Sequence, residues 1–181
     1  MVNWMRFVTP VSAFMLTNPS DEDLATKMAN CYSDAVSTAQ TILTNDFLLS
    51  GNKGTLRQGF LDAIRYGKKL NVPVSPTFDS LIGKAVVMFW SNATFKNIYT
   101  GLPPGGIAFS GSNKVISPGI CNPMPPFISG IGFVPTNLIF LNHLVLMFSM
   151  HLTTISGLHT IYTMSGPIAP IIAPLPWVGV Y

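Results

Sequence analysis

Apolar and polar positions alternate at helical spacing along the first half of the chain. The clearest stretch begins at Ser20, which fits the N-cap position of a helix because three acidic residues, 21–23, follow it directly. Apolar residues then recur every three or four positions as far as Leu43, with polar residues on the opposite side. This pattern predicts an amphipathic helix of about 22–25 residues.

Two more helices follow from the same kind of pattern. One is predicted from Thr55 to about Lys69, and Gly59 within it would let another helix approach closely. For the other, Ser75 serves as N-cap and Pro76 occupies the first helical position, and its apolar pattern continues to about residue 97. Residues 20–100 are therefore predicted to form a three-helix body.

The second half of the chain has a different texture. Residues 101–135 are rich in proline and glycine and are predicted to be an extended linker, with a short hairpin whose turn is 111–114. Residues 136–166 are predicted to form a long, apolar fourth helix. The tail, 167–181, is apolar and interrupted by prolines, so it is predicted to be an extended C-terminal arm.

The predicted fold class is therefore mainly α, a small bundle of about four helices with an extended segment and an extended arm. Residues 1–19 are predicted to be an N-terminal arm that packs against the body. A signal peptide is a poor fit there, because Pro10 interrupts the apolar run and no cleavage site of the A-x-A type follows.

Charge is scarce and unevenly distributed. Charged residues make up 9% of the 181 residues and hydrophobic residues 48%, which excludes a disordered, charge-rich chain. The chain has a formal net charge of +3, but its ten basic residues are scattered, which argues against nucleic-acid binding. From Val115 to Tyr181 there is no Asp, Glu, Lys or Arg. We expect this last third to be covered by the rest of the chain, by other subunits or by lipid.

No residue pattern indicates catalysis or a cofactor. The chain has no phosphate-binding glycine loop, no GxSxG and no CxxC motif, and the two cysteines, Cys31 and Cys121, are expected to be buried thiols. The three histidines are His143, His151 and His159. On a helix, a spacing of eight residues separates side chains by about 12 Å, so these residues are not expected to bind one metal ion. We therefore predict no enzyme activity, cofactor or metal site.

The predicted fourth helix leaves two functional classes open. It is long enough to cross a bilayer, but it carries a polar stripe at residues 142, 149, 153, 156, 160 and 163. Such a stripe is typical of a helix that packs among protein helices. A membrane protein, single-pass or peripheral, that uses residues 136–166 as its membrane element is the alternative to a protein-covered subunit.

The whole chain resembles, in texture, the small structural proteins of virus particles: the minor capsid, neck or tail proteins of tailed phages and large DNA viruses. The likeness consists of a short helical body, a Gly/Pro-rich extension and an apolar terminal arm. It implies a non-enzymatic subunit of a virion that binds other protein subunits, itself or other structural proteins, by burying apolar side chains. The predicted anchors are Trp177, Tyr181, Ile171, Ile172 and Leu175 in the arm and Phe127 and Phe133 in the linker.

Overall fold

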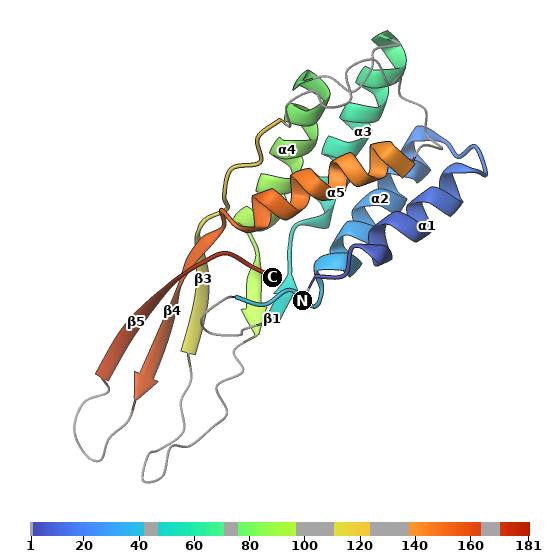
Figure 1. Ribbon diagram of the computed structural model, residues 1–181. Helices are drawn as coiled ribbons and strands as arrows, with labels where there is room; N and C mark the ends of the chain where they lie inside the picture. The colour runs from blue at the N-terminus through green and yellow to red at the C-terminus, as the bar shows by residue number, and fades with distance from the viewer. Residues whose placement is uncertain (1, 42–46, 71–75, 97–110, 124–137, 164–170) are drawn as a thin grey trace.

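The computed structural model describes residues 2–41, 47–70, 76–96, 111–123, 138–163 and 171–181 (Figure 1). This part of the chain is mainly helical, as the sequence predicts, and it also contains a five-stranded antiparallel sheet. The helices are α1 (Met5–Met15), α2 (Asp21–Val36), α3 (Lys53–Leu70), α4 (Pro76–Ser91) and α5 (Leu138–Leu152). The strands are β1 (Phe47–Ser50), β2 (Thr94–Lys96), β3 (Gly111–Ser117), β4 (Ser156–Thr163) and β5 (Ile171–Val178).

The three helices predicted within residues 20–100 correspond to α2, α3 and α4, and strands β1 and β2 lie in the same range. The Ser20 hydroxyl accepts a hydrogen bond from the Asp23 backbone N–H at 3.1 Å, which confirms the predicted N-cap of α2. α2 ends at Val36 and not near residue 43, because the segment after it turns away and Ala39 accepts a hydrogen bond from Leu48 in β1.

The later two body helices also begin close to their predicted positions. α3 and α4 pack tightly at Gly59, where an added Cβ would lie 2.1 Å from Cβ of Ala85. α4 starts at Pro76 as predicted, and Ser75 itself lies outside the described residues. It ends at Ser91, several residues earlier than predicted, because β2 begins at Thr94.

The predicted N-terminal arm is a helix. α1 contains Pro10 in its interior, which removes one main-chain hydrogen bond from the helix. Three buried side chains, Phe7, Val11 and Met15, hold it against the rest of the molecule. The N-terminal segment is packed, as expected, but it is a regular element of the helical layer.

The prediction of one helix over 136–166 is wrong in its second half. α5 ends at Leu152, and Ser156–Thr163 forms strand β4. β-branched residues are frequent after Leu152, and they fit a strand better than a helix. Gly157 is also required here, because an added Cβ would lie 2.2 Å from the Trp177 ring. Residues 153, 156, 160 and 163 of the predicted polar stripe therefore do not lie on a helix.

The sheet has the strand order β1–β2–β3–β4–β5, with every neighbouring pair antiparallel. The predicted hairpin turn at 111–114 is wrong: these residues lie in β3, where Ser112 pairs with Thr160 and Lys114 with Leu158. The flanking segment 107–109 lies outside the described residues, as do the other parts of the linker, 101–110 and 124–135. β3, β4 and β5 extend from the helices at one end of the molecule (Figure 1).

The C-terminal arm is extended, but it belongs to the chain's own sheet. β5 pairs with β4 along its whole length, from Ile171 with Thr163 to Val178 with Ser156. Beyond β5, the backbone N–H and C=O of Tyr181 form hydrogen bonds of 3.0 Å with Gln40. The end of the chain is thus joined to the segment between α2 and β1.

Two prolines of the arm, Pro174 and Pro176, face the open edge of the sheet. Gly179 donates to the Ile155 carbonyl at 2.7 Å, in register with the β4–β5 ladder. Because hydrogen bonding alternates along an antiparallel strand, the backbone groups of 177, 175, 173 and 171 face β4 and those of 178, 176, 174 and 172 face away from it. The missing N–H groups of the prolines therefore cost the ladder nothing.

Aromatic side chains form the centre of the core, under α5. The ring of Phe148 lies 5.0 Å from Tyr32 of α2, 5.6 Å from Phe7 of α1 and 5.7 Å from Trp4. Tyr32 also accepts a hydrogen bond of 2.8 Å from the indole N–H of Trp90 in α4. α5 thus packs across the layer formed by the other helices (Figure 1).

Candidate protein-binding surface

α5 has one face in the core and one face in solvent. Its buried side chains are Phe140, Leu141, His143, Leu144, Met147, Phe148, His151 and Leu152. On the opposite side, large apolar side chains are about half exposed: Leu138 (54%), Ile139 (50%), Leu146 (49%) and Met150 (55%). Asn142 is exposed between them. We call Leu138, Ile139, Asn142, Leu146 and Met150 the outer face of α5.

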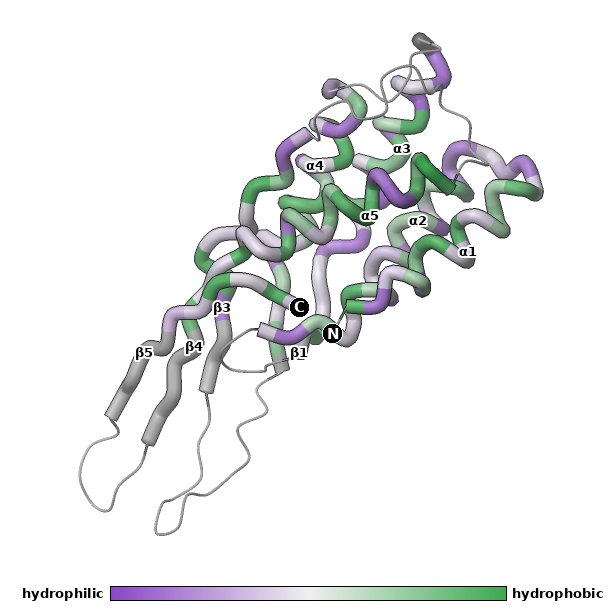
Figure 2. Tube along the Cα trace, viewed as in Figure 1, coloured by the Kyte–Doolittle hydropathy of each residue, from purple (hydrophilic) through white to green (hydrophobic). Residues whose placement is uncertain are grey.

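The outer face has none of the charged side chains that usually cover the solvent-exposed side of a helix. Solvent-facing sides of helices normally carry charged residues, and α5 contains none. Figure 2 shows the difference: α5 is hydrophobic along most of its length, whereas hydrophilic and hydrophobic residues alternate along α2 and α3. Single exposed apolar side chains are ordinary, but a continuous set of them marks an interaction surface.

A groove between α1 and α5 enlarges this surface. It has a volume of about 540 Å³ and is lined by Val2, Asn3, Trp4, Met5, Val8, Asn142 and Val145. Met5 is largely exposed at its border. Because Asn142 belongs to both features, the groove and the outer face adjoin each other on the surface.

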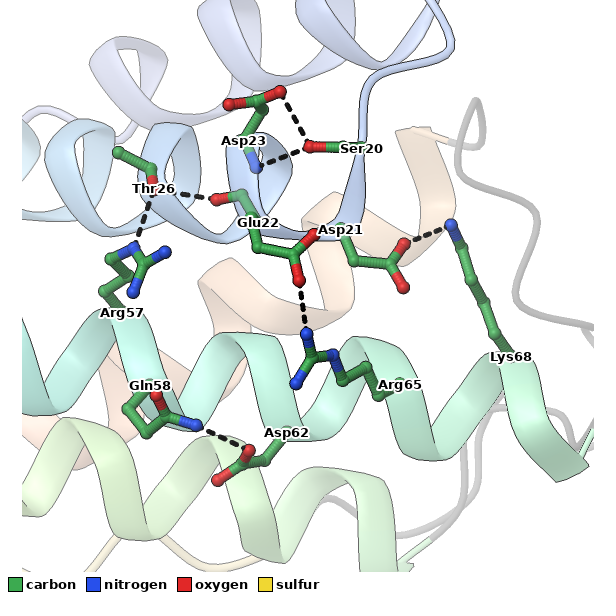
Figure 3. Close-up of polar contacts among 10 residues, drawn as sticks. All are labelled: Ser20, Asp21, Glu22, Asp23, Thr26, Arg57, Gln58, Asp62, Arg65 and Lys68. Atoms are coloured by element: carbon green, nitrogen blue, oxygen red, sulfur yellow. Dashed lines mark hydrogen bonds and ion pairs between the residues drawn. The ribbon is translucent and has the colours of Figure 1, made fainter.

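The exposed surface of α2 and α3 carries charged side chains, in contrast to the outer face of α5. Arg65 pairs with Glu22, and Lys68 pairs with Asp21 (Figure 3). Arg57 donates to the Thr26 hydroxyl at 2.8 Å. These side chains join the two helices on the exposed side, where water solvates both partners of each pair.

Of the three histidines, two have described side chains, and each is held by its own partner. His143 Nε2 donates to the two carboxylate oxygens of Asp79 at 2.9 and 3.0 Å, and both residues are buried between α4 and α5. His151 Nε2 donates to the Pro118 carbonyl at 2.7 Å. In the described part of the chain, no group of three or more His, Cys, Asp or Glu side chains is placed to hold a metal ion.

The two cysteines are free and buried. Burial is the main cause that raises the pKa of both thiols, and for Cys121 the nearby Asp79 carboxylate raises it further, to about 12. A thiol with a raised pKa is protonated at neutral pH and is a poor nucleophile. Neither cysteine therefore has the properties of a catalytic residue.

The predicted anchors in the arm have different environments. Trp177 is buried in the chain's own core, where its ring lies 5.4 Å from Phe95. Its apolar area is already used within the chain and is not on the surface. Tyr181 is partly exposed at the C-terminus. For Ile171, Ile172 and Leu175 the structure gives the backbone pairing in β5 and no side-chain environment. Phe127 and Phe133 lie outside the described residues.

The sequence prediction did not name the outer face of α5. Its positions 138, 142, 146 and 150 are spaced by four and are apolar except for Asn142, but α5 is hydrophobic on nearly every side. Such a helix gives no indication of which side faces inward. The available signal was the absence of charge after Lys114, which pointed to a covered region but not to particular residues.

No known family model matches this chain, and no curated protein or solved structure is similar to it.

Proposed function

We propose that this protein is a non-enzymatic structural subunit of a large assembly, a virus particle, and that it binds neighbouring protein subunits through the outer face of α5. The exposed, uncharged apolar side chains of this face are the observation in favour. A face of this kind gains free energy when another apolar surface covers it, at roughly 25 cal/mol per Å² of buried apolar area. The texture of the whole chain favours the virus particle as the assembly.

The lack of basic residues on α5 favours protein over lipid as the covering surface. Helices that lie on membranes usually carry Lys and Arg on their polar side, next to the lipid headgroups, and α5 has neither. In the described residues, no helix is long and apolar enough to cross a bilayer. A peripheral membrane protein that uses α5 remains the alternative that the experiment below separates.

The proposed binding surface differs from the arm that the sequence suggested. Trp177 and Val180 are buried within the chain, so removal of residues 167–181 would remove part of the core as well as a surface. A truncated chain that fails to assemble would therefore not identify the binding surface. Substitutions on the outer face of α5 leave the core residues in place and test binding alone.

The experiment compares Leu146→Glu with Leu49→Glu. Both leucines are exposed, Leu146 on α5 and Leu49 on β1, so each change adds one negative charge at the surface. Material from the native source is sedimented and floated through density gradients, with and without mild detergent. We expect the unchanged chain and Leu49→Glu to sediment with a dense particle in detergent, and Leu146→Glu to remain in the light fractions as a folded protein.

Two outcomes would contradict the proposal. If Leu146→Glu enters the particle as well as the unchanged chain does, the outer face of α5 is not the binding surface. If the unchanged chain floats with lipid and mild detergent releases it, the protein belongs to the membrane alternative. Circular dichroism of each purified variant shows whether it is folded, which separates loss of binding from loss of structure.

A further inference from the structure

The exposed side of α5 is arranged symmetrically about Asn142. Leu138 and Ile139 lie four and three positions before Asn142, and both are exposed. Val145 and Leu146 lie three and four positions after it, Val145 partly buried and Leu146 exposed. Counted outward from Asn142, the order is therefore the same in both directions: a β-branched aliphatic residue at three positions and leucine at four. A surface with this order is able to pair with itself.

A two-fold axis at right angles to the helix, passing Asn142, would bring two such surfaces together. In an isologous interface of this kind, residue i of one copy contacts residue j of the other, and j contacts i. The axis reverses the direction along the helix and keeps its two sides, and residues seven positions apart lie on the same side. Leu138 of one copy would therefore lie over Val145 of the other, and Ile139 over Leu146. The two Asn142 side chains would meet at the axis.

Asn142 supplies the polar group that such a pairing needs at its centre. Its side chain is exposed, and a carboxamide contains both an acceptor oxygen and an NH₂ donor. Across a two-fold axis, each of the two carboxamides donates one hydrogen bond to the other, so neither is left without a partner when water is excluded. A single asparagine within an apolar helix interface also fixes the register, because a shifted register would bury the amide against apolar side chains.

The groove between α1 and α5 offers space on one side of this pairing. Asn142 and Val145 form its α5 wall, and Trp4 and Val8 belong to its α1 side. This is the side on which the second copy would present Leu138, whose side chain is 54% exposed in the isolated chain. The groove, of about 540 Å³, is large enough for a leucine side chain, which would be buried there against largely apolar walls.

The absence of charge favours a second copy over an unrelated protein as the partner. α5 contains no Asp, Glu, Lys or Arg, so two copies would approach each other without like-charge repulsion. A partner with an ordinary charged surface would have to bury its charges against apolar side chains, which is costly. The chain itself presents an uncharged surface of matching length, with an amide at the position where Asn142 needs one.

We infer that the neighbour of this protein across the outer face of α5 is a second copy of the same chain, paired about a two-fold axis at Asn142. The inference rests on the function proposed above, because it names the partner that covers the outer face. The unit that enters the assembly is then a symmetric dimer.

The test is a charge-swap experiment on the purified full chain, measured by sedimentation equilibrium. The unchanged chain should show a reversible equilibrium between monomer and dimer. Asn142→Asp places two carboxylates at the axis, and Asn142→Lys places two ammonium groups there, so each variant alone should dimerise roughly 100-fold more weakly at low salt. An equal mixture of the two variants places Asp opposite Lys and should recover dimers that contain one chain of each kind.

The same substitutions at Met150 are the matched control. Met150 is exposed on the same helix, about 12 Å along it from Asn142. In the two-fold pairing the two Met150 side chains lie on opposite sides of the axis and do not meet. A mixture of Met150→Asp and Met150→Lys should therefore dimerise no more strongly than the two variants do alone.

A second variant tests the groove. Leu138→Ala shortens the side chain that enters the groove of the second copy, and it should weaken dimerisation at least about tenfold. Leu49→Ala, on β1, removes an exposed leucine outside the proposed interface and should leave the dimer unchanged. Circular dichroism of each variant shows that the chain is folded.

Two results would overturn the inference. One is a folded, unchanged chain that remains monomeric up to about 1 mM. The other is a dimer that the mixture of Asn142→Asp and Asn142→Lys does not restore, which would place the contact elsewhere on the chain.

The particle experiment with Leu146→Glu is evaluated separately. If Leu146→Glu stays out of the particle while the purified unchanged chain is monomeric, the outer face binds a different protein, and only the inference of a second copy fails. If the charge swap at Asn142 controls a dimer but Leu146→Glu enters the particle normally, the proposed assembly role fails and the dimer stands.

Discussion

Two helical surfaces of this protein expose opposite kinds of side chain to solvent, charged ones on α2 and α3 and apolar ones on α5. On α2 and α3, exposed carboxylates and basic side chains form ion pairs between the helices (Figure 3). On the outer face of α5, Leu146 and Met150 are about half exposed, and the helix contains no Asp, Glu, Lys or Arg. The first surface is suited to permanent contact with water, while the second is unfavourable in water until something covers it.

On the function proposed above, side chains that are exposed in the isolated chain are covered when the chain binds its neighbours. The exposed ion pairs stabilise the fold by little, since solvated pairs contribute about 0–1 kcal/mol, but they keep that side of the molecule soluble. The apolar residues of the outer face of α5 are not among the buried core residues, and their exposed area is unfavourable in water. These side chains are therefore better explained by a contact outside the chain than by the fold.

The largest effect should separate the two faces of α5 itself. Phe148→Ala removes a fully buried ring at the centre of the aromatic core, and we expect it to lower the free energy of unfolding by about 3–5 kcal/mol. Leu146→Ala, two residues earlier on the outer face, should change it by less than about 0.5 kcal/mol. Urea unfolding followed by circular dichroism measures both. An equal loss for both variants would mean that Leu146 also supports the fold.

The next effect concerns His151, which lies on the buried face of α5, and it is measured by changing the pH. Burial lowers the pKa of His151 from 6.5 to about 4 in the folded chain. Between these values the unfolded chain binds a proton that the folded chain does not, so the free energy of unfolding should fall as the pH is lowered from about 6.5 to about 4. The full loss is on the order of 3 kcal/mol.

Urea unfolding at pH 7 and at pH 4.5 measures most of this loss. The variant His151→Gln is the matched control, because it lacks the titrating group. It should lose much less stability between the two pH values. A parallel decline in both proteins would assign the effect to other groups.

The smallest effect belongs to the charged surface. Glu22→Gln breaks the exposed pair with Arg65, and it should lower the free energy of unfolding by at most about 1 kcal/mol. Because salt screens exposed pairs, the difference from the unchanged chain should shrink further at high ionic strength. A loss of several kcal/mol that salt does not reduce would show that this surface supports the fold more than its exposure suggests.

The elements that the sequence predicted well are those determined locally. Ser20 and the acidic residues after it define the start of α2 without reference to the rest of the chain, and Pro76 does the same for α4. The second half of the predicted fourth helix failed because its structure is decided by distant partners. Ser156–Thr163 is a strand because β3 and β5 lie on either side of it, and its Gly157 makes room for Trp177, 20 residues further along.

The candidate surface could be predicted only in outline. The absence of charge after Lys114 indicated a covered region, but an aromatic residue in an apolar tail, Trp177, looked like an anchor for a partner and is a core residue. Which side of α5 faces outward depends on Phe7 of α1 and Tyr32 of α2, whose rings contact Phe148. That contact joins segments more than 100 residues apart, and no local pattern contains it.

The prolines at the open edge of β5 have a consequence for how copies of this chain can meet. A strand that joined this edge would find carbonyl acceptors at positions 174 and 176 but no N–H donors, so its own carbonyl groups there would remain without partners. Stacking of sheets edge to edge is thereby disfavoured, although the C-terminal third is apolar and uncharged. The prolines therefore disfavour fibrous aggregation through this edge in a protein with few charged residues. Packing between helices remains the more favourable way for copies to associate.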